Sequence, residues 1–243
     1  MTDVRVALLP DALDARPRDV CAVVDVIRAS TTLVALAEAG DPAIWLARDL
    51  ASARASRRRW PDALLCGERG GAKPEGFDHG NSPREFTHAN LRGRRVVMTT
   101  TNGTIALWRW RHARRVFVGA LRNAGSVARR LLESAAGNGA DVTVVCAGRD
   151  GELALEDVYT AGAIVRQMLR AQPGLALDET AEVALRLRGA YGSAIEALAA
   201  SRGAKLLEPL GLWTDVAVCA EEDISTAVPE LGGAGRLRLL EDT

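Results

Sequence analysis

The chain has 243 residues, enough for a substantial core in one large α/β domain or two small ones. Hydrophobic residues make up 48% of it, which excludes a disordered chain, and the 31 basic side chains equal the 31 acidic ones, which argues against nucleic acid as a main partner. The first residues, MTDVRVALLP, show no secretory signal, and no apolar run has the length of a membrane span. We therefore expect no membrane partner and a cytoplasmic location.

The four cysteines are far apart and form no C-x-x-C pair. This spacing argues against structural zinc and gives no indication of disulfides. We expect buried free thiols in a reducing compartment. The cysteines are Cys21, Cys66, Cys146 and Cys219.

The first part of the chain predicts strands that alternate with helices. Strands are expected at residues 4–9, 20–26, 44–47 and 63–66, and helices at residues 30–39 and 49–59. The next passage, GERGGAKPEGFDHGNSP at residues 67–83, is too rich in glycine and proline for a regular element. A loop of this length inside a compact domain is usually functional.

The second part continues the alternation. A short helix is expected at residues 84–91, and strands at 96–98, 116–119 and 141–147. A hydroxyl-rich turn that opens a helix is expected within residues 99–110, longer helices at 123–136 and 155–169, and amphipathic ones at 179–187 and 193–200. Residues 210–219 give a short element of undecided type, and residues 236–240 an edge strand.

This order predicts a mostly parallel α/β sheet covered on both faces by helices. Ligands bind such sheets outside the carboxyl ends of the strands, and polar turns follow Val24, Cys66, Met98 and Cys146. VVDVIRASTTLVAL and VVMTTTNGTIALW can also be aligned at an offset of 72 residues. Within a single domain, this predicts two duplicated halves, about 1–92 and 93–243, although unrelated strand–turn–helix units also look alike.

The segment VVDVIRASTTLVAL, residues 23–36, is the strongest candidate for a site. Asp25 interrupts a β-branched apolar run, where a carboxylate is costly unless it binds something. Arg28 adds a guanidinium, and Ser30 and Thr31 are typical of a helix start, whose free N–H groups favour anions. The same residues are compatible with a buried strand and a plain helix cap, with Asp25 paired to Arg28.

Several known catalytic motifs are absent. No G-x-G-x-x-G follows a strand, and G-x-S-x-G and H-E-x-x-H do not occur. Residues 67–73 resemble a Walker loop only superficially, because Ala72 precedes Lys73 and Pro74 follows it. The remaining candidate ligands are oxygens and cations near the turns, which favour an anion site with Mg²⁺. Glu156 and Asp157 could equally well stabilise the dipole of the helix that they begin.

Five motifs in this order closely resemble the 2-phosphosulfolactate phosphatase family: DVIRASTT, CGERGG…EGFDHGNSP, TTTNGT, CAGRDG…ALEDVYTAG and CAEEDISTAVP. They extend from about residue 20 to residue 229. The resemblance implies a three-layer α/β/α fold with two similar halves and a Mg²⁺-dependent phosphatase that converts 2-phosphosulfolactate to sulfolactate, a step towards coenzyme M. The site positions that it implies are Asp25, Arg28, Ser30, Thr31, Glu68, Arg69, Asn81, Ser82, Thr100, Thr101, Asn102, Gly103, Thr104, Glu156 and Asp157.

The expected mechanism combines a metal with cations. Asp25, Glu68, Glu156 and Asp157 are expected to hold Mg²⁺, and Arg28 and Arg69 to hold the phosphoryl oxygens together with the TTTNGT helix start. Lys73 and Asn81 are expected to meet the sulfonate or carboxylate. The D-x-D-x-T pattern of phosphoaspartate phosphatases is missing, with Ile27 at the second Asp position, so water is the expected nucleophile.

Two other functions stay open at this point. One is a phosphatase for another small phosphorylated acid, and the other is a non-enzymatic protein that binds small anions or has a regulatory role on the same scaffold. The sequence also leaves open whether the chain forms a homo-oligomer, because Trp108, Trp110 and Trp213 suit either a core or an interface.

Overall fold

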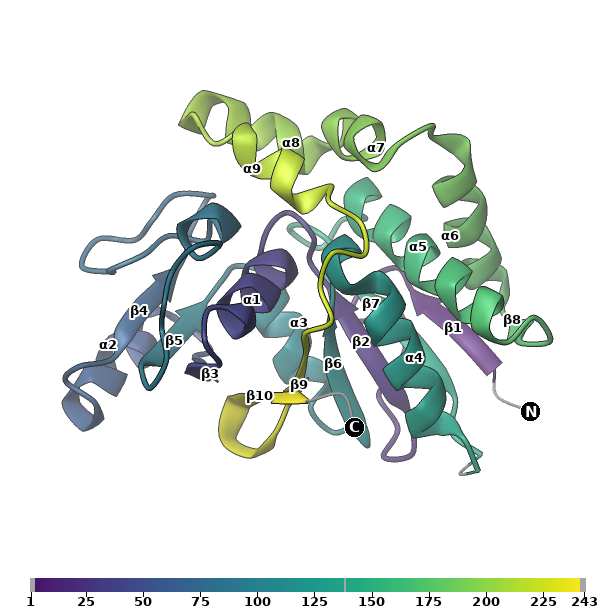
Figure 1. The fold of residues 1–243 in the computed structure, drawn as a ribbon, viewed down its shortest axis with the longest axis horizontal. Coiled ribbons are helices and arrows are strands. Elements are labelled where there is room, and N and C mark those ends of the chain that lie inside the picture. Colours follow the sequence, from purple (N-terminus) through teal and green to yellow (C-terminus); the bar gives the residue numbers. More distant parts are fainter. Residues whose placement is uncertain (1–2, 138, 241–243) are drawn as a thin grey trace.

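The computed structural model describes residues 3–137 and 139–240, and within them ten strands form one sheet with helices on both faces (Figure 1). The predicted three-layer α/β/α class is confirmed. The strands are β1 (Asp3–Ala7), β2 (Val20–Val24), β3 (Ala43–Leu46), β4 (Leu64–Gly67), β5 (Arg95–Thr99), β6 (Arg115–Gly119), β7 (Val142–Cys146), β8 (Ala176–Leu177), β9 (Val228–Leu231) and β10 (Arg236–Leu240). The helices are α1 (Ala29–Glu38), α2 (Leu50–Arg59), α3 (Gly103–Trp110), α4 (Ala124–Ala135), α5 (Leu155–Ala171), α6 (Glu179–Ala190), α7 (Ala194–Ala200), α8 (Arg202–Leu207) and α9 (Thr214–Cys219).

The sheet consists of two parallel blocks joined by an antiparallel hairpin. A three-strand block, β4-β5-β3, and a five-strand block, β6-β2-β7-β1-β8, are each parallel throughout. Between them lie β10 and β9, which pair antiparallel with each other and with β3 and β6, respectively. In Figure 1 this yellow hairpin lies between the two blocks.

The prediction of an edge strand at residues 236–240 is therefore wrong. The strand exists, but β10 has a neighbour on each side. The alternation of Arg236, Leu237 and Arg238 correctly indicates one buried and one exposed face, with Leu237 only 3% exposed. Such alternation reports which face is buried and carries no information about how many strands flank the strand.

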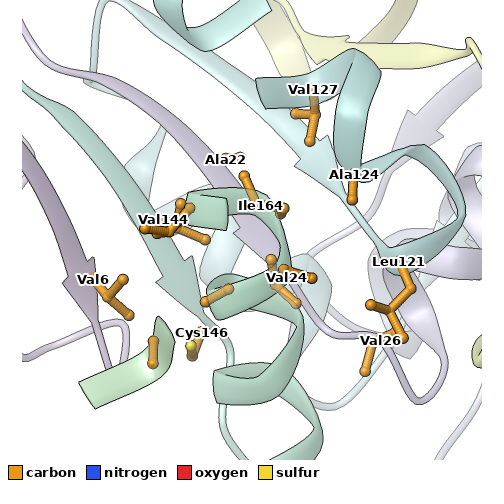
Figure 2. Packing of buried hydrophobic residues seen from close by; sticks show 14 of the residues in the cluster. Val6, Ala22, Val24, Val26, Leu121, Ala124, Val127, Val144, Cys146 and Ile164 are labelled. Carbon is orange, nitrogen blue, oxygen red and sulfur yellow. The ribbon is translucent and has the colours of Figure 1, made fainter. Parts of the chain in front are cut away.

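Strand β2 lies at the centre of the five-strand block and is buried on both faces. Each of its residues is at most 2% exposed. Val20, Ala22 and Val24 pack with α4, α5 and the neighbouring strands, as Figure 2 shows for Ala22 and Val24, whereas Cys21 and Val23 pack towards α1 and α3. Burial of a valine side chain stabilises a fold by roughly 1.5–3 kcal/mol, so the end of this strand, and hence Asp25, is firmly placed.

The helices divide between the two faces and the two blocks. Helices α4, α5 and α6 cover one face of the five-strand block. The apolar sides of α1 and α3 pack on its other face and reach the three-strand block, whose far side is covered by α2. No helix among the described residues is both long and apolar enough to cross a bilayer.

Several local predictions can be compared with the structure. Asp49 caps α2 as expected by accepting a hydrogen bond from Ser52 N, and all four cysteines are free and buried. The prediction of a helix at residues 84–91 is wrong, because only a 3₁₀ turn, Pro83–Glu85, forms there and single turns follow it. Trp110 is fully buried in the core, whereas Trp213 is 43% exposed. Helix α8 and the strands β8 and β9 were not predicted.

The strands of residues 1–92 and those of the rest of the chain interleave in the sheet. Strand β2, for example, lies between β6 and β7. The two proposed halves therefore do not form separate lobes, and the duplication stays a prediction.

Candidate active site

A cavity of about 300 Å³ lies where the loops after β2, β4, β5 and β7 converge. These loops come from both parallel blocks, and α8 supplies a further wall. The structure thus brings together the four polar turns that the sequence singles out. Of the predicted site residues, those that line the cavity are Asp25, Arg28, Glu68, Asn81, Thr101 and Asn102.

Asp25 lies directly after β2 and is 8% exposed. Burial raises the pKa of its carboxyl to about 6, with further increases from Glu68 and Glu156, while Arg149 and the backbone N–H of Ala29 oppose them. Its carboxylate also lies against the start of α3, where a Cβ atom on Gly103 would come within 2.7 Å of Asp25 Oδ2. Glycine at position 103 is what allows this close approach.

Arg28 is held in place by Asp215 rather than by Asp25. Its Nη1 donates to Asp215 Oδ2 at 2.7 Å, and its Nη2 donates to the carbonyl oxygen of Gly71 at 2.5 Å. The fully buried Asp215 also accepts a hydrogen bond from Ser82 Oγ at 2.7 Å. Asp215 on α9 therefore links the β2–α1 loop to the GNSP turn and fixes the guanidinium at the cavity wall.

Glu68 organises the backbone on its side of the cavity. Its Oε1 accepts a hydrogen bond from Thr101 N at 2.7 Å, and its Oε2 accepts one from Gly71 N at 2.8 Å. A carboxylate can accept about four hydrogen bonds or metal contacts, so Glu68 keeps acceptor capacity towards the cavity.

The predicted hydroxyl donors mainly stabilise loops. Ser30 Oγ accepts from Asp25 N, and Thr31 Oγ1 donates to the carbonyl of Val26. Thr100 and Thr104 each accept a backbone N–H from the other and thereby fix the start of α3. Short hydroxyl side chains often bond nearby backbone in this way. These residues shape the site from behind the cavity wall.

Two buried oxygens of the cavity-lining residues have no hydrogen-bond partner in the described part of the chain. They are Asn81 Oδ1 and Thr101 Oγ1. Buried polar atoms are normally satisfied, so these two are candidates for contact with a ligand. Asn102 lies beside them and accepts a long hydrogen bond, 3.5 Å, from Asp150 N.

Glu156 and Asp157 lie behind the cavity at the start of α5, and both are 2% exposed. Asp157 accepts hydrogen bonds from Val26 N at 2.9 Å and from Gly148 N at 3.1 Å, which ties the β2 loop to the β7 loop. Burial raises the pKa of Asp157, and the charges of Asp25 and Glu156 raise it further.

Two predicted cations do not line the cavity. Arg69 donates to the carbonyl of Glu68 at 2.6 Å and to Thr99 Oγ1 at 3.1 Å, so it braces the β4 loop against β5. Lys73 is exposed, and its Nζ donates to the carbonyl of Asp78 at 3.4 Å.

The donor set of the cavity suits Mg²⁺ in one specific way. Across residues 3–137 and 139–240, no three His, Cys, Asp or Glu side chains form a metal-binding group. Asp25 and Glu68 nevertheless face the same cavity as the unpartnered Asn81 Oδ1. Mg²⁺ usually takes only one or two carboxylates from a protein when substrate phosphate completes its shell, so these oxygens fit the ion.

Three contributing residues were not among the predicted site residues. Arg149 and Arg202 line the cavity, and Asp215 positions Arg28. Arg149 belongs to the AGRDG turn after β7, which the sequence does mark as polar. Asp215 lies 187 residues from its partner Arg28, and no local pattern reports that pairing.

Taken together, the fold and the cavity define an α/β protein with a cavity lined by charged side chains at the carboxyl ends of its strands, the usual place for a ligand in this class, beside a buried carboxyl whose pKa is raised to about 6. Three arginines face this cavity: Arg28 and Arg149 from two loops, and Arg202 from the start of α8.

Sequence comparisons agree with this class. A family described as 2-phosphosulpholactate phosphatase matches residues 7–233. Proteins named probable 2-phosphosulfolactate phosphatase from Deinococcus radiodurans and Thermus thermophilus are 44% and 43% identical to this chain, the first over 98% of both chains and the second over 95% of this chain and 94% of the relative. A protein of the same name from Gloeobacter violaceus is 39% identical over 94% of both chains. The chain belongs to the 2-phosphosulfolactate phosphatase family, a family of phosphoric monoester hydrolases.

Proposed function

We propose that this protein is a Mg²⁺-dependent phosphatase that hydrolyses the phosphomonoester of 2-phosphosulfolactate, or of a related phosphorylated 2-hydroxy acid, to the free hydroxy acid and phosphate. The observation that carries the proposal is the buried Asp25, whose pKa is raised to about 6, in a cavity that Arg28, Arg149 and Arg202 also face. The names of the relatives support the substrate. The buried free thiols suit a cytoplasmic location.

In the reaction, a water oxygen bonds to phosphorus while the ester P–O bond breaks, and the leaving oxygen takes up a proton. Negative charge redistributes over the phosphoryl oxygens in a loose transition state. In this proposal Arg28, fixed by Asp215 and lining the cavity, holds phosphoryl oxygens with its remaining N–H groups. The unpartnered Thr101 hydroxyl can donate a hydrogen bond to the same group, and Asn81 Oδ1 can accept one from its hydration water.

Asp25 and Glu68, with Asn81 Oδ1, are the residues that would hold Mg²⁺. When bound, the ion neutralises phosphate charge and polarises the phosphoryl group. In this proposal Glu156 and Asp157 do not bind Mg²⁺, although the sequence analysis expects them to. Glu156 helps to keep the pKa of Asp25 high, and Asp157 holds the β2 and β7 loops together through its two backbone hydrogen bonds.

The test is phosphate release from a panel of phosphorylated 2-hydroxy acids, including 2-phosphosulfolactate, compared by kcat/KM with Mg²⁺ and with EDTA. We expect turnover with Mg²⁺ only. Asp25→Asn should lower kcat by roughly 10²-fold or more, because it removes a charged group from the reacting centre. Asp14→Asn, at an exposed position that does not line the cavity, is the matched control. Full activity of folded Asp25→Asn would refute the assignment.

The same assay separates this proposal from a non-enzymatic anion-binding protein. Such a protein would bind phosphate in calorimetry and release none from any ester.

A second measurement identifies the nucleophile. The reaction with ³²P-labelled substrate is quenched with denaturant, and the protein is examined for bound label. Because Ile27 replaces the second Asp of the D-x-D-x-T pattern, we expect no label on Asp25.

A further inference from the structure

Two arginines lie between the main cavity and a second, smaller one of about 140 Å³, and they line both. These are Arg149, in the turn after β7, and Arg202, the first residue of α8. We propose that this pair is a subsite that binds the second acid group of the substrate, a sulfonate or carboxylate, while the phosphate lies beside Asp25. This inference rests on the proposed function and adds to it the residues that select the substrate.

Arg149 has hydrogen-bonding capacity that the protein does not use. Among the described residues, its Nη2 makes only a 3.3 Å hydrogen bond to the carbonyl of Ile27 and a 3.6 Å ion pair with Glu156 Oε1. Its Nε is buried without a partner among the described residues. A guanidinium carries five N–H donors in a planar fork, which suits the paired oxygens of a carboxylate or sulfonate.

Arg202 is held by a contact that a ligand can replace. Its Nη1 lies 2.5 Å from Glu152 Oε2, and both side chains are about two-thirds exposed, at 66% and 68%. Ion pairs between such exposed groups contribute little to stability. An acid group of the substrate can therefore exchange with Glu152 for the same guanidinium.

The start of α8, which carries Arg202, is packed closely against Arg149. A Cβ atom on Gly203 would lie 2.0 Å from Glu156 Oε1 and 2.9 Å from Arg149 Nη2. Only a glycine at position 203 allows α8 to approach Glu156 and Arg149 so closely. The helix is anchored by Ser201, which accepts from Ala204 N, and by the buried Leu207.

In this proposal Arg149 and Arg202 take the role that the sequence suggested for Lys73 together with Asn81. Lys73 lines neither cavity, whereas Arg149 and Arg202 line both. Arginine also differs from lysine in chemistry, because its fork recognises planar or multi-oxygen acids with two hydrogen bonds at once.

The experiment compares 2-phosphosulfolactate with isopropyl phosphate, which has the ester but no second acid group. For each enzyme the readout is the ratio of kcat/KM for the two substrates. Arg202→Gln should lower this ratio by about tenfold or more, mainly through KM, because a charge-assisted hydrogen bond is lost. Arg202→Lys should restore part of it. Arg186→Gln, on the exposed face of α6, should leave it unchanged.

An equal loss on both substrates, or an unchanged ratio in Arg202→Gln, would overturn the subsite while the phosphatase function stands. If the wild-type protein hydrolyses no phosphomonoester, the proposed function fails by itself. The subsite is then decided by calorimetry with sulfolactate, which carries both acid groups and no phosphate. Binding that weakens about tenfold in Arg202→Gln supports the subsite, and equal affinity refutes it.

Discussion

The charge on Asp25 is unfavourable in the folded protein without a ligand. Burial comes first among the causes that raise its pKa from the ordinary 3.8 to about 6, and the acids Glu68 and Glu156 add to it. A bound cation would reverse this balance, because an opposite charge favours the ionised form. The ionised Asp25 therefore lowers the stability of the unliganded fold, and its carboxylate readily binds a cation or a proton, as is common at functional sites.

This residue gives a pH-dependent stability prediction. The folded state holds the Asp25 proton more tightly than the unfolded state, so no penalty exists below about pH 4. The penalty grows as the pH rises from 3.8 towards 6 and reaches up to about 3 kcal/mol above it. In EDTA, Asp25→Asn should therefore be more stable than the wild type at about pH 7.5 and nearly equal at about pH 4. Urea unfolding at both pH values measures this, and an equal difference at both would contradict it.

At the same scale, sequence patterns locate charged groups better than they assign their partners. Asp25 and Glu68 were expected at the site because they follow apolar strands, and the structure places both at the cavity. Ser30 and Thr31 were expected as ligand donors, but their oxygens bond the adjacent backbone. The Arg28–Asp215 pair depends on the packing of α9, which no spacing in the sequence reveals.

At the scale of elements, contiguous apolar runs were predicted well. Strand β7 and helix α5 lie within one or two residues of the expected bounds, because β-branched runs and 3.6-residue periodicity report local structure directly. Short elements such as α8 and β9 have too few residues for a period. Their existence depends on what they pack against, as does the failure of residues 84–91 to form a helix.

Packing of α5 on α6 depends on a glycine. A Cβ atom on Gly162 would lie 2.0 Å from the carbonyl oxygen of Ala184 on α6. Gly162→Ala should therefore separate the two helices and destabilise the fold by about 1–3 kcal/mol. Gly189→Ala is the matched control, because Gly189 is exposed on α6 with open space around it, and alanine there should stabilise the fold by roughly 0.5–1 kcal/mol.

Chemical denaturation of the two alanine variants decides this prediction. The expected shifts have opposite signs, so a general effect of replacing glycine by alanine would be recognised at once. A Gly162→Ala variant as stable as the wild type would show that the helices can adjust without loss of packing.

At the scale of the whole molecule, the β9–β10 hairpin joins the two parallel blocks. Removal of residues 228–243 would expose the facing edges of β3 and β6 and divide the sheet. We expect such a chain to lose cooperative unfolding and to bind a dye for exposed apolar surface. Arg238→Ala, at an exposed position of β10, should keep the cooperative transition, since surface substitutions usually change stability by less than about 0.5 kcal/mol. A cooperative transition in the shortened chain would contradict the role of the hairpin.

The position of the β9–β10 hairpin in the middle of the sheet also affects how the chain folds during its synthesis on the ribosome. Chains are made from the N-terminus, and β9 and β10 follow every other strand of the sheet in the sequence. Each block can therefore assemble early, but the contacts that join them arrive last. During that interval two unpaired edges are exposed, and pairing between chains at such edges leads to aggregation. We expect the yield of folded protein to depend on chaperones that cover these edges until the last strands emerge.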